Sequence, residues 1–134
     1  MKKRVYIDTS VVGGYFDDEF NDGTIPFFEL VNNGEVTIIV SDLLEAELLG
    51  APDFVKKLLN DIEEKNIERI NLDEKATILA DKYIEAKVVG KTSWADCQHI
   101  AMATISNADV LVSWNFKHIV NLDKIRAYNG INYQ

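Results

Sequence analysis

Three acidic residues stand at points of the sequence where their carboxylates could act together. Asp8 directly follows an apolar run, Glu47 lies one turn into a predicted helix, and Asp96 lies in the first turn of another. Gathered carboxylates repel one another and are costly to desolvate unless a cation joins them. Oxygen ligands select hard divalent ions, which bind phosphodiesters and activate water. The three acids therefore predict a Mg²⁺ or Mn²⁺ site if the fold brings them together.

Each of these acids also has a purely structural explanation. Asp8 could cap the helix that follows it, and Asp96 has capping-box spacing from Ser93. Glu47 could be a solvated helix residue, and the helical wheel does not separate it from Glu45, because each lies beside leucines. Spacing alone suggests a metal site and leaves these alternatives open.

The order of the predicted elements explains how the acids could meet. Apolar, β-branched runs predict strands at 4–7, 36–40, 67–72 and 110–113, and helical patterns separate them. This alternation predicts one α/β domain over residues 1–134, with three layers (α/β/α) and a mainly parallel central sheet. In such a sheet the carboxyl ends of the strands share one edge, where ligands bind.

The helices are predicted from apolar periodicity and from capping residues. Asp42 and Glu45 have the form of a capping box, and residues 17–22 are an acidic loop. The first predicted helix follows Ser10. The second starts at 24–26 and ends at 32–34, and the third begins at 42. The remaining four span 52–66, 73–89, 93–107 and 121–128.

Composition bounds the class of protein. The 134 residues are 47% hydrophobic and 27% charged, as in an ordinary globular protein. The net charge of −8 argues against a nucleic-acid binder with a wholly basic surface, but not against a nuclease whose metal ions supply positive charge. There is no run of about 20 apolar residues, no signal-peptide pattern, and a single cysteine, Cys97. We therefore expect a cytoplasmic protein without a membrane partner.

Four segments, in order along nearly the whole chain, resemble the motifs of PIN-domain proteins, of the kind found as VapC-type toxins in toxin–antitoxin pairs. The first, YIDTSVV, has Asp-Thr-Ser after a strand, and the second, SDLLEAELLGAP, has a serine followed six positions later by Glu-Leu. The third, WADCQHIAMA, has an aspartate that opens an apolar helix with His and Ala. The fourth, ADVLVSWNFKHI, is a strand that ends in Ser before a polar turn.

The resemblance implies a metal-dependent endoribonuclease with a PIN-like fold. It implies that Asp8, Glu47 and Asp96 hold Mg²⁺ or Mn²⁺, and it selects Glu47 over Glu45. It further implies an RNA substrate, a homodimer, and an antitoxin protein that fills a groove beside the active site. The predicted helix 52–66 is a candidate for part of this groove or of the dimer contact, and the alternative is that its apolar stripe belongs to the core. It also implies that Ser10, Ser113 and Asn115 orient water or phosphate. For the two serines, simple helix capping is the alternative. The basic residues Lys91 and Lys117 could guide the RNA strand.

One departure from the family pattern supports a different function. PIN domains often carry a further acid in the last turn, where this chain has Asn115 and His118. A second metal site should therefore be weak, and the alternative is a non-catalytic PIN-like module that binds RNA or a protein. A receiver-like or phosphatase domain fits less well, because the acids lack the paired arrangement of those sites. We expect His99 and Cys97 to be structural, and Trp94 and Trp114 to serve in packing.

Overall fold

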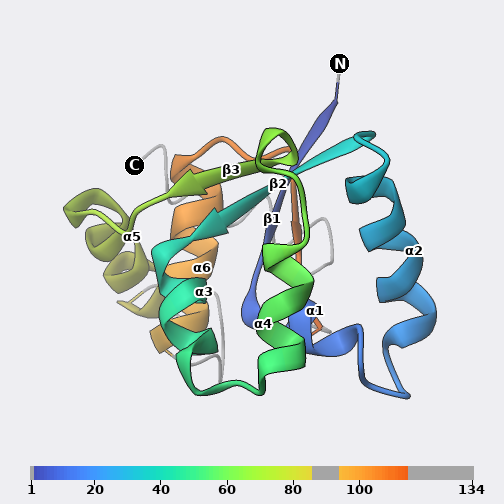
Figure 1. Cartoon of the computed structure of the whole chain (residues 1–134). Helices are drawn as coiled ribbons and strands as arrows, with labels where there is room; N and C mark the ends of the chain where they lie inside the picture. The colour runs from blue at the N-terminus through green and yellow to red at the C-terminus, as the bar shows by residue number, and fades with distance from the viewer. Residues whose placement is uncertain (1, 86–93, 115–134) are drawn as a thin grey trace.

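A four-stranded parallel sheet forms the centre of the computed structural model, which describes residues 2–85 and 94–114 (Figure 1). The strand order is β3-β2-β1-β4, and every neighbouring pair is parallel. The strands are β1 (Lys3–Ile7), β2 (Val36–Ser41), β3 (Ile67–Ile70) and β4 (Val110–Val112). The predicted α/β architecture with a mainly parallel sheet is confirmed, although β3 and β4 are shorter than their predicted runs.

Helices cover both faces of this sheet. In Figure 1, α5 and α6 lie on one face, and α1, α2 and α4 lie on the other, while α3 follows the carboxyl end of β2. The helices are α1 (Thr9–Gly14), α2 (Asn21–Asn32), α3 (Asp42–Glu47), α4 (Asp53–Asn60), α5 (Glu74–Glu85) and α6 (Trp94–Ile105), with short 3-10 turns η1 (Leu48–Gly50) and η2 (Glu64–Asn66). Within the described ranges, no helix has the length and apolar character needed to span a membrane.

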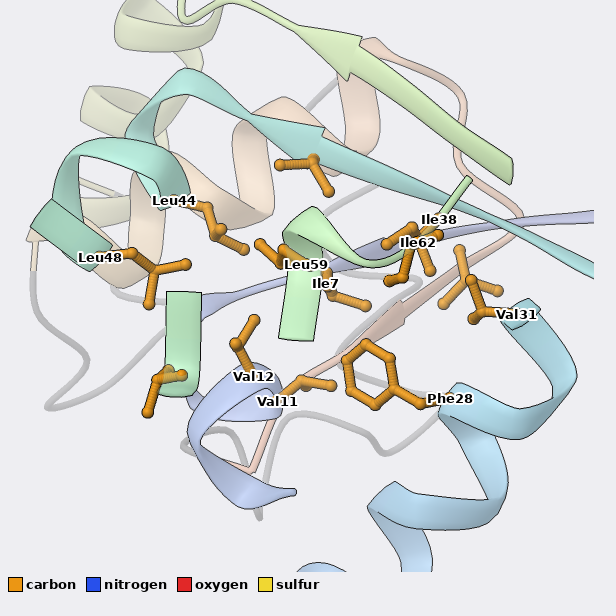
Figure 2. Packing of buried hydrophobic residues seen from close by; sticks show 13 residues of the cluster. Ile7, Val11, Val12, Phe28, Val31, Ile38, Leu44, Leu48, Leu59 and Ile62 are labelled. Carbon is orange, nitrogen blue, oxygen red and sulfur yellow. The ribbon is translucent and has the colours of Figure 1, made fainter. Parts of the chain in front are cut away.

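Two hydrophobic cores follow from the alternation of side chains along the two central strands. Tyr6 and Ile39 pack with α5 and α6, whereas Ile7 and Ile38 pack on the other face (Figure 2). Because both faces of β1 and β2 are buried, these strands are nearly continuous apolar runs. The core shown in Figure 2 consists of Val5, Ile7, Val11, Val12, Phe28, Val31, Ile38, Val40, Leu44, Leu48, Val55, Leu59 and Ile62.

Two predicted helix boundaries are wrong. α2 begins at Asn21, before the predicted start at 24–26, so the predicted loop at 17–22 is shorter and Pro26 lies inside the helix. α4 ends at Asn60 instead of 66. Ile62 continues the apolar spacing of α4 but packs into the core from a turn after the helix, so periodicity alone could not show where the helix ends.

Other predicted helices agree with the structure over the residues that it describes. The helix predicted at 73–89 corresponds to α5, and the helix after Ser93 corresponds to α6. Residues 86–89 and the predicted helix 121–128 lie outside the described residues.

Candidate active site

Asp8 lies at the carboxyl end of β1, and its side chain is only 2% exposed. The Ser10 hydroxyl donates to Asp8 Oδ1 at 2.6 Å, and the Ser113 hydroxyl, just beyond β4, donates to Oδ2. Asp8 stands at the N-cap position of α1, but its side chain makes no capping hydrogen bond. The carboxylate therefore faces the edge of the sheet, between two hydroxyls supplied by segments far apart in the sequence.

The two serines are connected to each other and to the chain beyond β4. Ser10 Oγ lies 3.3 Å from Ser113 Oγ and accepts a hydrogen bond from the Trp114 backbone N–H at 2.9 Å. Neither serine acts as a simple helix cap in these contacts. Their hydrogen bonds fix the orientation of the Asp8 carboxylate, and their predicted role in orienting water or phosphate stays a prediction.

Burial raises the pKa of Asp8 above its ordinary value, because a charged carboxylate loses its hydration there. The hydrogen bonds from Ser10 and Ser113 favour the ionised form and act in the opposite direction. A positive ion beside the carboxylate would offset the cost of burial. Each Asp8 oxygen accepts one of these hydroxyls and has a second lone pair left for another partner.

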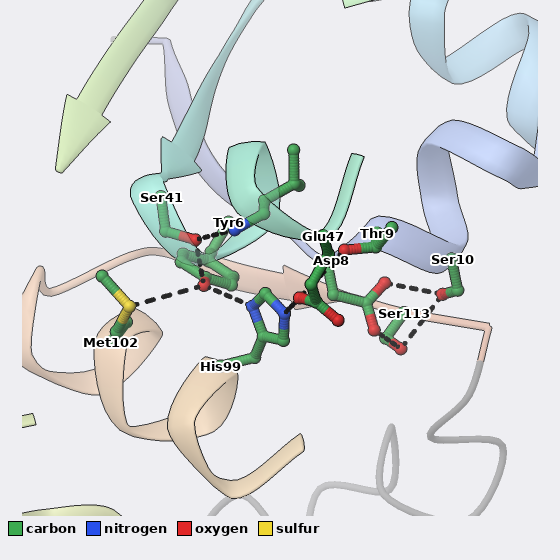
Figure 3. A network of polar contacts seen from close by, with 10 residues as sticks. Tyr6, Asp8, Thr9, Ser10, Ser41, Glu47, His99, Met102 and Ser113 are labelled. Atoms are coloured by element: carbon green, nitrogen blue, oxygen red, sulfur yellow. Dashed lines mark hydrogen bonds and ion pairs between the residues drawn. The ribbon is translucent and has the colours of Figure 1, made fainter. Parts of the chain in front are cut away.

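Glu47 ends α3 beside the turn that carries Asp8 (Figure 3). Its Oε1 accepts a hydrogen bond from the Thr9 hydroxyl at 3.1 Å and lies 2.6 Å from His99 Nε2. The Glu47 side chain is 36% exposed. Since Thr9 directly follows Asp8 in the chain, the two acids lie at the same edge of the sheet.

The structure distinguishes Glu47 from Glu45, which the helical wheel did not. Glu45 forms an ion pair with Arg69 of β3, and Arg69 also pairs with Glu64. These three side chains are on the surface, about half exposed or more. Glu45 is therefore held away from Asp8, whereas Glu47 is next to it.

The predicted capping box at the start of α3 is wrong. Ser41 is the N-cap, and its Oγ accepts a hydrogen bond from the Leu44 N–H at 3.0 Å. Asp42 Oδ1 instead accepts from the Leu72 N–H at 2.7 Å. Because α3 starts directly at the end of β2, one short helix is enough to place Glu47 beside Asp8.

The third acid, Asp96, lies in the first turn of α6, one turn before His99. Its side chain lies outside the part of the chain that the structure describes, as does the whole of Ser93. Asn115, His118, Lys91 and Lys117 also lie outside that part. Over the described residues, no group of three or more His, Cys, Asp or Glu side chains is arranged to hold a metal.

The two described acids fit a hard divalent cation by the chemistry of their donors. Asp8 is a buried carboxylate whose charge lacks full compensation, and Glu47 is a partly exposed carboxylate beside it. Oxygen donors of this kind suit Mg²⁺ or Mn²⁺ better than softer metals. A third carboxylate from α6 would complete a set typical of such ions.

His99 has more polar contacts than sequence reasoning expected. It is 2% exposed, and its Nδ1 lies 2.6 Å from the Tyr6 hydroxyl while its Nε2 contacts Glu47. The sequence offered only the position of His99, one turn after Asp96 on an apolar helix. His99 was expected to be structural, and its contact with Glu47 was missed.

The remaining sequence candidates have structural roles in the described residues. Cys97 is buried in the core beside α5. Trp114 stacks on Phe20 with ring centroids 5.5 Å apart, and its Nε1 donates to the Thr24 hydroxyl at 3.0 Å. Trp114 is therefore a packing residue, as expected, while the Trp94 side chain is outside the described residues.

Comparisons with known proteins identify the fold. No family model matches the sequence, and no curated protein matches it significantly. Among solved structures, VapBC2 from Rickettsia felis, bound to a DNA fragment from its promoter, is 18% identical with a TM-score of 0.61, covering 87% of this chain and 92% of that one.

Two further structures are similar over most of their length. VapC20 from Mycobacterium tuberculosis, a toxin that cleaves the sarcin–ricin loop, is 12% identical with a TM-score of 0.62, covering 92% of this chain and 94% of the other. FitAcB from Neisseria gonorrhoeae is 17% identical with a TM-score of 0.56, covering 93% of each chain. This chain therefore has the fold of VapC-type proteins, as the sequence resemblance implied.

Proposed function

We propose that this protein is a metal-dependent endoribonuclease, the toxin of a toxin–antitoxin pair. The observation that carries the proposal is the buried Asp8 carboxylate at the carboxyl end of β1, next to the partly exposed Glu47. The fold shared with VapC20, which cleaves an RNA loop, supports RNA as the substrate. Burying a carboxylate at a ligand-binding edge costs stability, and binding a cation there would give that cost a functional reason.

In this proposal the three acids Asp8, Glu47 and Asp96 hold Mg²⁺ or Mn²⁺. When bound, the ion neutralises charge on the phosphodiester and activates water for hydrolysis. The hydroxyls of Ser10 and Ser113 keep the Asp8 carboxylate oriented toward the open edge. We further propose that Asn115 orients water or phosphate through its amide, and that Lys91 and Lys117 guide the RNA strand.

The experiment that tests this proposal compares the purified protein with Asp8→Asn on single-stranded RNA. Cleavage is measured with Mg²⁺ or Mn²⁺ and with a chelator, and metal binding is measured by calorimetry. Asparagine has nearly the same shape as aspartate, so the change removes charge and leaves the packing of the site intact. We expect metal-dependent cleavage by the wild type that is lost in the variant, because a ligand to the ion has been removed.

A different outcome would favour a non-catalytic module that binds RNA or a protein. If both proteins are inert on several RNAs and calorimetry finds no divalent binding that depends on Asp8, the nuclease proposal is refuted. Asn115, at a position where PIN domains often have an acid, is the sequence feature that favours this alternative.

We also propose an antitoxin protein as partner, docked beside α4, with a homodimer of this chain in the cytoplasm. α4 leaves Phe54 56% exposed in contact with Phe16, and η1 leaves Leu49 75% exposed. A cavity of about 280 Å³ opens between these elements, with Leu48, Leu59 and Lys56 among the residues that line it. Leu49 lines this cavity, whereas Phe54 lies outside its lining. Exposed apolar groups of this kind suit an amphipathic helix of a partner.

The test for the partner is co-purification with the product of a neighbouring small gene that encodes a DNA-binding protein. Binding that is lost in Phe54→Asp, with RNA cleavage retained, would support docking at α4. Unchanged binding in that variant would contradict it.

A further inference from the structure

A buried chain of polar contacts connects the start of α3 with the acid at its end (Figure 3). The Leu44 N–H donates to Ser41 Oγ at 3.0 Å, and the Tyr6 hydroxyl oxygen lies 3.0 Å from the same atom. Tyr6 also contacts His99 Nδ1, and His99 Nε2 contacts Glu47. This series of contacts therefore joins β1, α6 and both ends of α3. All of its side chains are buried except that of Glu47, which is partly exposed.

The contact between His99 and Glu47 requires a hydrogen on the histidine. An ionised carboxylate only accepts hydrogen bonds, so the hydrogen in the 2.6 Å contact belongs to Nε2 of His99. The Tyr6 hydroxyl faces the other ring nitrogen at 2.6 Å, and the two rings pack edge to face with centroids 5.7 Å apart. A ring that is held at both nitrogens and buried has little freedom to rotate.

The two hydrogen bonds to Glu47 from the described residues both reach Oε1. Thr9 donates to this oxygen at 3.1 Å, and His99 lies 2.6 Å from it. Oε1 is therefore held from the end of β1 and from α6, and neither of these two hydrogen bonds uses the second oxygen, Oε2.

We propose that His99 is a positioning residue for Glu47, holding Oε1 through its Nε2–H so that Oε2 is presented to a divalent cation. This inference rests on the proposed function, which places the cation at this edge. His99 itself does not bind the metal. Tyr6 and Ser41 orient the imidazole, so that the direction of Glu47 is set from the core of the protein. Partners that orient a metal-binding carboxylate typically contribute about 10- to 100-fold in metal affinity.

Binding of Mn²⁺, measured by calorimetry, tests the proposal on three variants. His99→Phe keeps a planar ring and removes the N–H, whereas His99→Gln keeps an N–H donor of similar reach. Ile100→Val, at a neighbouring buried residue with an apolar side chain, is the matched control for a loss of packing in α6. We expect about 10- to 100-fold weaker Mn²⁺ binding in His99→Phe, substantial recovery in His99→Gln and wild-type affinity in Ile100→Val.

Cleavage kinetics provide a readout that a merely structural role would not change. In His99→Phe the Mn²⁺ concentration for half-maximal activity should rise, while the rate at saturating Mn²⁺ stays near that of the wild type. Nitrogen-15 spectra of the metal-free wild type should show a hydrogen on Nε2 of His99. This last measurement does not depend on any variant folding.

The outcomes separate this inference from the proposed function. If Mn²⁺ binding depends on Asp8 but a folded His99→Phe binds as tightly as the wild type, positioning by His99 is overturned and the nuclease proposal stands. An Nε2 without a hydrogen would overturn it as well. If the wild type binds no Mn²⁺, both the proposed function and this inference fail.

Discussion

Replacing Asp8 by asparagine should stabilise the metal-free protein while abolishing its proposed activity. The carboxylate is 2% exposed, and its burial raises its pKa, so the fold holds this charge at a cost. Asparagine removes the charge and keeps groups that can hydrogen-bond with Ser10 and Ser113. The sign of the change in stability depends on which of two opposing contributions is larger.

The first contribution is the loss of charge assistance in two hydrogen bonds. A hydrogen bond to a charged group stabilises by about 1.5–3 kcal/mol and a neutral one by about 0.5–1.5 kcal/mol, so two such bonds lose roughly 2 kcal/mol. The second is the desolvation of a buried ion, which costs several kcal/mol. Since the pKa of Asp8 is raised in spite of both hydroxyls, desolvation is the larger contribution. We expect a net stabilisation of about 1 kcal/mol, or a melting temperature higher by about 2–5 °C.

The pH dependence gives this prediction a second check. Because the folded pKa is raised, the folded chain binds a proton at Asp8 more tightly than the unfolded chain does. Wild-type stability from this group is therefore lost as pH rises through the folded pKa. The difference in the free energy of unfolding between Asp8→Asn and the wild type should be fully present above the folded-state pKa of Asp8. It should disappear below the unfolded-state pKa of about 3.9.

Thermal unfolding in chelator, followed by circular dichroism from acid to neutral pH, measures both effects. Ser113→Ala is a useful comparison, because it removes a donor and leaves the charge, and it should destabilise. Adding Mn²⁺ should raise the melting temperature of the wild type alone. At a Mn²⁺ concentration of 100 times the Kd, binding adds about 2.7 kcal/mol to the free energy of unfolding. A variant Asp8→Asn that is less stable than the wild type in chelator at neutral pH would refute the reasoning.

Three further predictions follow from other contacts. Glu47→Gln should abolish metal-dependent RNA cleavage, whereas Glu45→Gln should leave cleavage unchanged, because it loses only an exposed ion pair of about 0–1 kcal/mol. An equal loss of cleavage in both variants would contradict the separation of the two acids. Gly14→Ala should destabilise by about 1–3 kcal/mol in chemical denaturation, because its Cβ would lie 2.6 Å from the Trp114 indole nitrogen; an unchanged midpoint would contradict this packing. Phe54→Asp should weaken antitoxin binding in a pull-down without lowering stability, since this side chain is 56% exposed; retained binding would exclude α4 as the docking site.

The sheet could be predicted from the sequence because its information is local. The runs at β1 and β2 are apolar on both faces, and each ends in a polar residue, so Asp8 and the end of β2 were expected at one edge. The parallel register confirms that expectation. Asp109, which precedes β4, lies at the opposite edge, where it exchanges hydrogen bonds with the Arg4 backbone.

Features that depend on long-range contacts could not be predicted. α3 has six residues, too few for a helical wheel to separate Glu45 from Glu47, and only the partner of each acid does so. Arg69, the partner of Glu45, lies on β3, and His99, the partner of Glu47, lies on α6, 52 positions further along the sequence. The cap of α3 was misplaced by one residue for a related reason, because Asp42 hydrogen-bonds to the chain after β3 instead of to its own helix.

The direction of Asp8 follows from the two-residue period of β1. Tyr6 packs in the core beside α6, Ile7 packs in the opposite core, and Asp8 continues the alternation with extended backbone angles. Asp8 therefore faces the same side as Tyr6, toward α6, which carries His99 and Asp96. A shift of one residue would turn the carboxylate into the apolar core around Ile7 and would lose the contact between Tyr6 and His99. The register that buries Tyr6 thus also turns Asp8 toward α6, the helix that supplies His99 as the partner of Glu47, so the hydrophobic core and the site are specified by the same alternation.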